Sequence, residues 1–395
     1  MTTKRTFPNS RMAGIKMAGG IREIMGLSEK MAQNGRDIIH MDLGKTDFNS
    51  PQKSIETAVY AVTHGNVHYT DMAGTFELRS AVAEKYNKDY NLGLTADENI
   101  VISQGATEAL SLSMLTLMAP GEEMIIPAPY FTPYIDEAQL FGIKPVIAQS
   151  KEENGFKIKA SELEEKITSK TAVILLNSPN NPSGAVYSRE DLQEIADIAI
   201  KHDLWIISDE CYEKFVYEGK YVSIISLPGM AERTVIVSSA SKTWSMTGWR
   251  VGWVVAPKSL RPYVNKCHQN IATCANSFAQ AGVCEAFKSG NVESAAMVKE
   301  YKRRRDMVYR WISETKGMTM RSPEGAFYAF PSIKAFGMPG IDFCMQLLEE
   351  TGVSTTPGEA FGMPGYIRLA YCQDYDYIEK GMKRIKDFCA KLDIK

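Results

Sequence analysis

Five short apolar runs stand out in the middle of this chain, and each one ends in small or polar residues before a helical pattern begins. They lie within residues 99–115, 123–141, 171–184, 204–215 and 234–244. Unbroken runs of Val, Ile and Leu are typical of strands that are buried on both faces. Strands that alternate with helices in this way predict an α/β fold, in which helices sandwich a mostly parallel sheet.

The pattern changes after about residue 290. A long polar helix over 292–314 is followed by two strand-like segments, GAFYAFP and YIRLAY, and by a final helix over 374–391. A chain of 395 residues also exceeds what one hydrophobic core usually organises. We therefore predict two domains. The large domain spans residues 48–290, and a smaller α+β domain combines residues 291–395 with residues 1–47, which include an N-terminal arm.

The charge balance and the cysteines limit the binding partners and the cellular compartment that we expect for this chain. Its 45 basic and 47 acidic side chains leave a net charge of -2, which provides no field for nucleic acid or an anionic membrane. Seven cysteines without a CxxC pair favour reduced thiols and a cytoplasmic protein. The sequence has neither the apolar block of a secretory signal nor a membrane span. We expect no nucleic-acid partner, no membrane partner and no metal.

Gly105, Ala106 and Thr107 lie between the first predicted strand and the helix that follows it. Small residues let backbone N–H groups approach an anion, the helix dipole favours negative charge there, and the Thr107 hydroxyl adds a donor. Backbone geometry alone also explains a glycine at such a turn, because the spacing of a nucleotide-binding loop is missing. Ser239 and Arg250 are expected near the same sheet edge, and both suit phosphate oxygens. These residues favour a cradle for one phosphate.

Asp209 ends the apolar run LWIIS, so its carboxylate leaves a buried strand, where an unpaired charge is costly. A cation or a strong donor is therefore expected to face it; the alternative is that Asp209 caps a following helix. Tyr212 projects from the same side if a helical turn begins here. Asn181 lies in the loop NSPNNPSG, where it is either a turn residue or a donor toward a ligand.

Lys242 follows the last of the five apolar runs and lies among serine and threonine residues. Partial desolvation lowers the pKa of such a lysine and frees an amine that can attack a carbonyl. The alternative is a lysine paired with a carboxylate. A nucleophilic lysine, a cradle for one phosphate and a buried carboxylate are together the groups that pyridoxal phosphate requires. The lysine forms a Schiff base with it, and the carboxylate pairs with its pyridine nitrogen.

The motifs of nearly the whole chain resemble, in their order, those of the class I and II pyridoxal-phosphate aminotransferases of fold type I. They are LGKTDFNSP, HYTDMAGTFELR, GATEAL, PAPYFTPY, NSPNNPSG, SDECYEKFVYEG, SSASKTWSMTGWRVGW, GAFYAFP and YIRLAY. The resemblance implies a transaminase that exchanges an amino group between an L-amino acid and a 2-oxo acid by a ping-pong mechanism. It also implies that Lys242 holds the cofactor as an aldimine and moves the substrate's α proton.

The same resemblance implies a role for each of the other candidate residues. Asp209 faces the pyridine nitrogen, Tyr212 and Asn181 face the phenolic oxygen of the cofactor ring, and Phe131 stacks on that ring. The residues that hold the phosphate are Gly105, Ala106, Thr107, Ser239 and Arg250.

For the substrate, the resemblance implies that Arg368 clamps the α-carboxylate, with Asn181 and the backbone of Gly44 beside it. Tyr69 is implied to reach the phosphate of a neighbouring subunit, which predicts a homodimer with shared active sites.

Two departures from the family pattern bear on specificity. Lys45 stands where the family usually has a glutamate, and it either adds a cation for an acidic substrate or is a surface exchange. Gln269 aligns near the arginine of dicarboxylate-specific relatives, so strict aspartate specificity is not expected. Two alternative functions are a carbon–sulfur β-lyase, or another elimination enzyme with the same cofactor, and a non-catalytic regulatory protein that binds pyridoxal phosphate.

Overall fold

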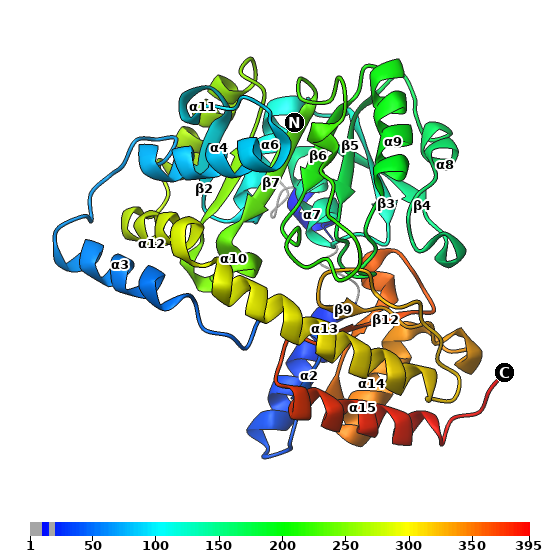
Figure 1. The fold of residues 1–395 in the computed structure, drawn as a ribbon. Helices are drawn as coiled ribbons and strands as arrows, with labels where there is room; N and C mark the ends of the chain where they lie inside the picture. Colours follow the sequence, from blue (N-terminus) through cyan, green and yellow to red (C-terminus); the bar gives the residue numbers. More distant parts are fainter. Residues whose placement is uncertain (1–9, 16–19) are drawn as a thin grey trace, which may run out of the picture.

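The computed structural model describes residues 10–15 and 20–395, and its central feature is a seven-stranded sheet (Figure 1). The strand order is β2-β8-β7-β6-β5-β3-β4. β8 runs antiparallel to β2 and β7, whereas the neighbouring pairs from β7 to β4 are parallel. The predicted mostly parallel α/β sheet is therefore confirmed. The strands are β2 Ile100–Ser103, β3 Glu123–Ala128, β4 Lys144–Gln149, β5 Thr171–Asn177, β6 Trp205–Asp209, β7 Thr234–Ser239 and β8 Gly252–Val255.

Helices cover both faces of this sheet. Successive side chains of a strand point to opposite faces, and here the side chains on both faces are apolar and buried. Ile126 and Ile207 lie in the core on one face, whereas Ile125 and Ile206 lie in a core on the other. The first face is covered by α6 Ala106–Leu117, α7 Pro133–Phe141 and α11 Arg261–Ala272. The second face is covered by α4 Phe76–Tyr90, α8 Ala160–Glu164, α9 Arg189–Lys201 and α12 Ser277–Ser289. Further helices of this half are α3 Gln52–Thr63, α5 Ala96–Asn99 and α10 Ala240–Thr243.

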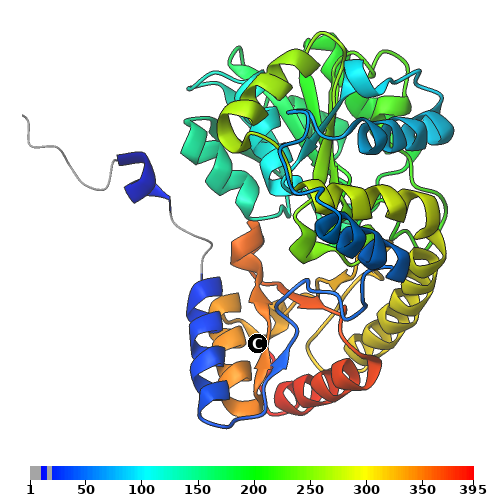
Figure 2. The same ribbon diagram turned by 90° about the vertical axis from the view of Figure 1, so that its left-hand side faces the viewer.

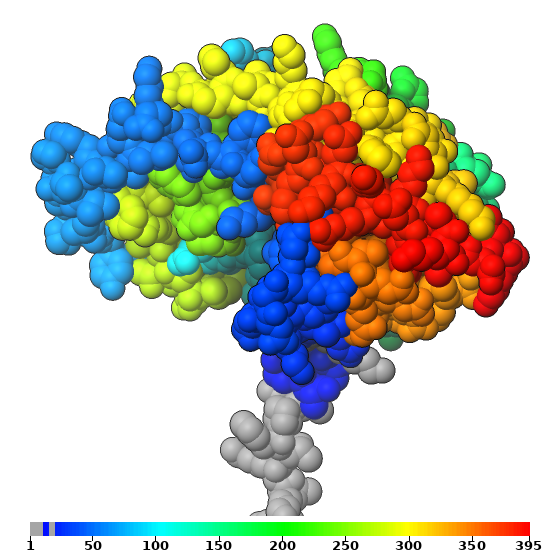
Figure 3. Space-filling view, turned by 90° about the horizontal axis from the view of Figure 1, so that it is seen from below, coloured from blue at the N-terminus to red at the C-terminus, as the bar shows by residue number. Residues whose placement is uncertain are grey.

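A second core joins the two ends of the chain. Its antiparallel sheet has the order β11-β12-β9, and a separate parallel pair joins β1 to β10. Figure 2 shows α13 extending from the large sheet toward α15, and Figure 3 shows the blue N-terminal residues against the orange and red C-terminal ones. The elements of this core are α2 Ile21–Gln33, β1 Ile39–His40, α13 Asn291–Ser313, β9 Tyr328–Ala329, α14 Gly340–Thr351, β10 Val353–Ser354, β11 Thr356–Pro357, β12 Ile367–Ala370 and α15 Tyr375–Cys389, whereas α1 Ser10–Gly14 lies against α7 of the other half.

The pairing of β1 with β10 joins residues 39–40 to residues 353–354. The division at residues 48 and 290 stays a prediction, and residues 1–9 and 16–19 of the expected N-terminal arm lie outside the described part. In the described part of the chain, no helix has the length and apolarity needed to cross a bilayer.

Candidate active site

Three neighbouring strands of the large sheet end in polar side chains at the same edge. β5 ends at Asn177, β6 at Asp209 and β7 at Ser239, and Asn177 lies opposite Asp209 in the register of the two strands. Lys242 follows β7 on the short helix α10. A cavity of about 530 Å³ opens at this edge, and all four side chains line it.

The N-terminus of α6 forms one wall of this cavity, with Ala106 and Thr107 as its first helical residues. Gly105 precedes them with a φ of 82°, in the left-handed region that favours glycine. A Cβ at Gly105 would overlap the Arg250 guanidinium, and one at Gly252 would overlap the backbone of Gly105. Gly105 therefore leaves room for the Arg250 guanidinium, and Gly252 lets β8 lie against the start of α6. A guanidinium beside free helical N–H groups is an arrangement that fits a phosphate.

Asp209 is buried and accepts two hydrogen bonds. The Tyr134 hydroxyl donates to Oδ2 at 2.5 Å, and the Cys211 N–H donates to Oδ1 at 3.1 Å. Burial raises the pKa of Asp209, against the effect of these donors and of the Lys242 cation. Residues 211–214 form a turn, so the alternative of a helix cap is wrong. A buried carboxylate with this environment suits a cationic ligand group.

Lys242 is partly buried, and its Nζ donates to the Gly44 carbonyl at 2.9 Å. The Nζ also lies 5.7 Å from the centre of the Phe327 ring. Burial is the main cause that lowers the pKa of Lys242, and the positive charge of Arg368 adds to the effect. The hydrogen-bond partner is a neutral carbonyl, which does not match the alternative of a lysine paired with a carboxylate. Lys242 thus has the properties of a nucleophilic amine.

Arg368, in β12, reaches the cavity from the second core. Its Nη1 donates to Asn181 Oδ1 at 3.1 Å, and its Nη2 donates to the Asp42 carbonyl at 2.5 Å and to Thr356 Oγ1 at 3.3 Å. Within the described residues, the buried Nε has no hydrogen-bond partner. A guanidinium that is held firmly and keeps a spare donor suits a carboxylate ligand.

Tyr212 also lines the cavity, and its hydroxyl lies 2.9 Å from that of Tyr328. Burial raises the pKa of Tyr328 to about 12 and that of Tyr212 well above its ordinary value. Both hydroxyls therefore keep their protons at neutral pH. A Cβ at Gly44 would overlap the Tyr328 hydroxyl, so the backbone at residue 44 can approach only as glycine.

Nearly all the residues predicted from the sequence meet at this one cavity, although Gly105 lies just behind its wall and Tyr69 does not line it. The Tyr69 side chain is 82% exposed. Lys45 and Gln269 are also absent from the described lining. The predicted residues that line the cavity are Gly44, Ala106, Thr107, Phe131, Asn181, Asp209, Tyr212, Ser239, Lys242, Arg250 and Arg368.

Two tyrosines of the cavity were not predicted as site residues. Tyr134 and Tyr328 occur in the motifs PAPYFTPY and GAFYAFP, which was the only signal available for them. Their partners lie 75 and 116 residues away in the sequence. Such contacts depend on how the elements pack, and a motif by itself does not encode them.

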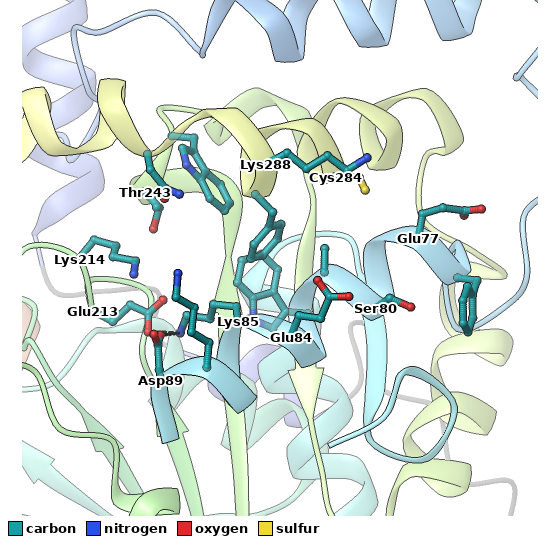
Figure 4. Close-up of a pocket in the computed structure, with 17 residues that line it drawn as sticks. Glu77, Ser80, Glu84, Lys85, Asp89, Glu213, Lys214, Thr243, Cys284 and Lys288 are labelled. Atoms are coloured by element: carbon teal, nitrogen blue, oxygen red, sulfur yellow. Dashed lines mark hydrogen bonds and ion pairs between the residues drawn. The ribbon is translucent and has the colours of Figure 1, made fainter. Parts of the chain in front are cut away.

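A second cavity, of about 620 Å³, lies between α4 and α12 (Figure 4). Figure 4 shows Lys85, Glu213 and Asp89 together on one side, whereas Glu77 and Lys288 lie apart from them. Lys85 forms an ion pair with Glu213 and lies 3.7 Å from Asp89. Among the described residues that line it there is no glycine. The cavity at the strand ends is therefore the better candidate for a phosphate-containing ligand.

Comparison with known proteins gives one consistent result. The family model for aminotransferase class I and II matches residues 36–385. The chain is 39% identical to aromatic-amino-acid aminotransferase 2 of Thermococcus litoralis, over 90% of this chain and 92% of that protein. It is also 39% identical to the aspartate aminotransferase of Pyrococcus abyssi, over 93% and 94% of the two chains. The crystal structure of the aspartate aminotransferase from Rhizobium meliloti superposes with a TM-score of 0.94, at 32% identity, over 98% and 100% of the chains.

Proposed function

The chain belongs to the class I and II aminotransferases and is a pyridoxal-phosphate-dependent transaminase, and from this we propose that the cavity at the ends of β5, β6 and β7 is its active site. The similarity to aminotransferases supports this activity over the β-lyase and the non-catalytic regulatory protein considered above. The observation that carries the proposal is Lys242. Its amine has a lowered pKa and lies in a cavity that also holds a buried carboxylate and an anion cradle.

When bound, pyridoxal phosphate supplies an aldehyde that joins amines and a ring that withdraws electrons from the substrate. We assign the ring nitrogen to Asp209, the phenolic oxygen to Tyr212 and Asn181, and the ring face to Phe131. Burial supports the assignment of Asp209. Its hydrogen-bond donors and the Lys242 cation do not fully offset the cost of burying the charged carboxylate, and a protonated ring nitrogen would stabilise that charge. The residues assigned to the phosphate are Gly105, Ala106, Thr107, Ser239 and Arg250.

Lys242 has two tasks in this proposal. In the resting enzyme, its Nζ holds the cofactor. After an amino acid has taken that place, the free Nζ accepts the proton from the substrate's α carbon and later returns a proton. The lowered pKa favours the neutral amine, which both tasks require. The contact with the Gly44 carbonyl orients the same nitrogen without adding charge.

Arg368 is assigned to the α-carboxylate of the amino acid or 2-oxo acid. Its contacts with Asn181, Thr356 and the Asp42 carbonyl fix the guanidinium, so little side-chain entropy is lost when the substrate binds. The unpartnered Nε is a donor that a carboxylate can satisfy. This assignment applies to both substrates of the exchange, because each carries a carboxylate beside the reacting carbon.

The rest of the cavity suggests a broad choice of substrate side chains. Ile21, Met25, Leu110 and Phe361 provide apolar surface, and Arg22 lines the same cavity. Hydrophobic pockets discriminate only by about 1 to 3 kcal/mol per methylene. We therefore propose that apolar and aromatic amino acids are donors, without strict specificity for aspartate. The names of the relatives, which refer to aromatic amino acids and to aspartate, agree with this range.

We further propose a cytoplasmic homodimer in which Tyr69 reaches the phosphate bound by its partner. Tyr69 is exposed and follows α3, whose exposed side chains include Val59, Tyr60 and Val62. An apolar patch of this kind is typical of a protein interface. The seven cysteines are all free, which is in keeping with a reducing compartment.

Borohydride trapping tests the central assignment. The purified protein is saturated with pyridoxal phosphate, reduced, digested and mapped, and we expect a pyridoxyl group on Lys242. The Lys242→Ala variant is expected to lose the label. The Lys258→Ala variant, which removes an exposed lysine paired with Glu98, keeps it. An unlabelled Lys242 in saturated protein would contradict the proposal. Incubation with each of the twenty amino acids, followed by the loss of the cofactor's visible absorbance, then identifies the donors.

A further inference from the structure

Tyr328 lies at the centre of the site but has no part in the assignments above. Its side chain is buried, and its hydroxyl lies 2.9 Å from the Tyr212 hydroxyl. The two rings meet edge to face, with centres 5.7 Å apart. Because burial keeps both hydroxyls protonated, one of them donates to the other, and the acceptor keeps its own proton for a further bond.

Two other site residues hold Tyr328 in place. The Arg368 guanidinium lies 4.8 Å from the centre of its ring, within cation–π distance. The hydroxyl fills the space where a side chain at residue 44 would lie, and the carbonyl of Gly44 accepts the bond from Lys242. Tyr328 therefore contacts Tyr212, which is assigned to the phenolic oxygen, and Arg368, which is assigned to the substrate carboxylate. It also lies against Gly44, whose carbonyl accepts the hydrogen bond from the lysine. A side chain fixed on three sides has one orientation available for its hydroxyl oxygen.

We propose that Tyr328 is a positioning residue that donates to Tyr212 and thereby directs the Tyr212 proton at the phenolic oxygen of the cofactor. This inference rests on the proposed function. A tyrosine hydroxyl has one proton to donate. Tyr212 can therefore donate to the cofactor only if Tyr328 is the donor, and Tyr212 the acceptor, in the hydrogen bond between them. A hydroxyl that accepts one hydrogen bond is also a stronger donor in the next.

The proposal predicts a spectroscopic change in the Tyr328→Phe variant, which keeps the ring and loses the hydroxyl. The weaker bond from Tyr212 leaves the phenolic oxygen more basic, so the cofactor held at Lys242 keeps its proton to a higher pH. We expect the midpoint of the pH titration of the visible absorbance to rise by about 0.5 pH unit. Tyr212→Phe is expected to raise it further, because that change removes the direct donor.

A matched control separates this effect from the loss of any buried hydroxyl. Tyr371 is also buried, its hydroxyl lies 3.4 Å from the Ala326 carbonyl, and it does not line the cavity. Tyr371→Phe is expected to leave the midpoint unchanged. The double variant of Tyr212 and Tyr328 is expected to shift no further than Tyr212→Phe alone, because both changes act on the same bond. Additive shifts would overturn the proposal even if Tyr328→Phe also perturbed the packing.

Borohydride labelling of the same proteins distinguishes the two proposals. A labelled Lys242 with an unchanged midpoint in Tyr328→Phe overturns only the role of Tyr328. An unlabelled Lys242 in the parent protein overturns the proposed function, and the role of Tyr328 with it. A labelled Lys242 with a raised midpoint, together with an unchanged Tyr371→Phe control, supports both.

Discussion

Asp209 is the residue whose loss is expected to reduce activity most, apart from Lys242 itself. In the proposed site, Asp209→Ala leaves the ring nitrogen without its counter-charge, a loss of about 3 to 5 kcal/mol by analogy with broken buried pairs. Each 1.4 kcal/mol or so is tenfold in rate, so kcat is expected to fall at least about 100-fold. Asp203→Ala is the control, since that carboxylate is 95% exposed, and its kcat is expected to stay near that of the parent. A loss below tenfold in Asp209→Ala would contradict the assignment.

Glu210, the next residue, is expected to make the stability of the fold depend on pH. It is fully buried, Ser208 and Ser223 donate to its Oε1, and burial raises its pKa from 4.5 to about 7. Because the folded pKa lies above the unfolded one, the stabilisation is complete below about pH 4.5 and is lost as the pH rises through 7. In urea unfolding of the apoprotein, Glu210→Gln is expected to flatten the decline in unfolding free energy between about pH 5 and pH 8. Equal slopes in parent and variant would refute this.

The sequence was enough to predict that the candidate residues which directly follow a buried strand lie together at one edge of the sheet. Asp209 and Lys242 each come after an apolar run, and parallel strands place such residues at one edge of a sheet. The same argument does not predict the role of Tyr134, because its contact with Asp209 depends on how α7 packs onto the sheet. The requirement for glycine at residue 44 is similar, since it arises from a hydroxyl that lies on β9.

At the level of elements, the N-terminus of α6 depends on Gly105. Gly105→Ala adds backbone strain at positive φ and a Cβ that overlaps the Arg250 guanidinium. We expect the dissociation constant for pyridoxal phosphate to rise at least about tenfold, which corresponds to roughly 1.4 kcal/mol. Titration of the apoprotein with the cofactor, followed by absorbance, measures this.

Gly93→Ala is the matched control for that change. Gly93 has a φ of 68°, and a Cβ there would meet nothing within 4 Å. The substitution therefore introduces the same kind of backbone strain without the overlap. It is expected to lower stability and to leave cofactor affinity unchanged. Equal losses of affinity in the two variants would show that strain, and not the cradle, explains the result.

The two long C-terminal helices were predicted well, whereas two strands of the large sheet were missed. The helices expected over 292–314 and 374–391 are observed as α13 Asn291–Ser313 and α15 Tyr375–Cys389. β4 and β8 were not among the predicted strands. β4 lies at the sheet edge and is only partly buried, and β8 has four residues and is separated from β7 only by the four-residue helix α10 and one 3-10 turn. GAFYAFP contributes only the two-residue strand β9, because the following residues leave the sheet.

At the scale of the whole molecule, the site combines residues from both cores. Asp209 ends β6 of the large sheet and Lys242 lies on α10 directly after β7, whereas Arg368 and Tyr328 belong to the smaller sheet. Asp47, near the Gly44 backbone, accepts two hydrogen bonds of 2.9 Å from Arg304 on α13. The position of the Gly44 carbonyl beside Lys242 thus depends on the helix that links the two cores. Any change in how the cores sit together changes the distance between the lysine and the carboxylate clamp.

The proposed dimer makes a prediction at the same scale. Val59 on α3 is 57% exposed, and Figure 1 shows this helix at the edge of the molecule. A carboxylate buried there would lose several kcal/mol of hydration. Val59→Glu is therefore expected to weaken association about 1000-fold, by roughly 4 kcal/mol. Sedimentation velocity at micromolar concentration is expected to show a dimer for the parent and a monomer for the variant.

Val292→Glu serves as the control, because it places the same substitution on a valine that is 79% exposed on α13. It is expected to remain dimeric and to bind pyridoxal phosphate as the parent does. Val59→Glu is expected to bind the cofactor more weakly, since a monomer lacks the Tyr69 that its partner contributes to the phosphate. A monomeric parent would contradict the shared site. A dimeric Val59→Glu would place the interface on another face, and a monomer with full cofactor affinity would remove Tyr69 from the phosphate site.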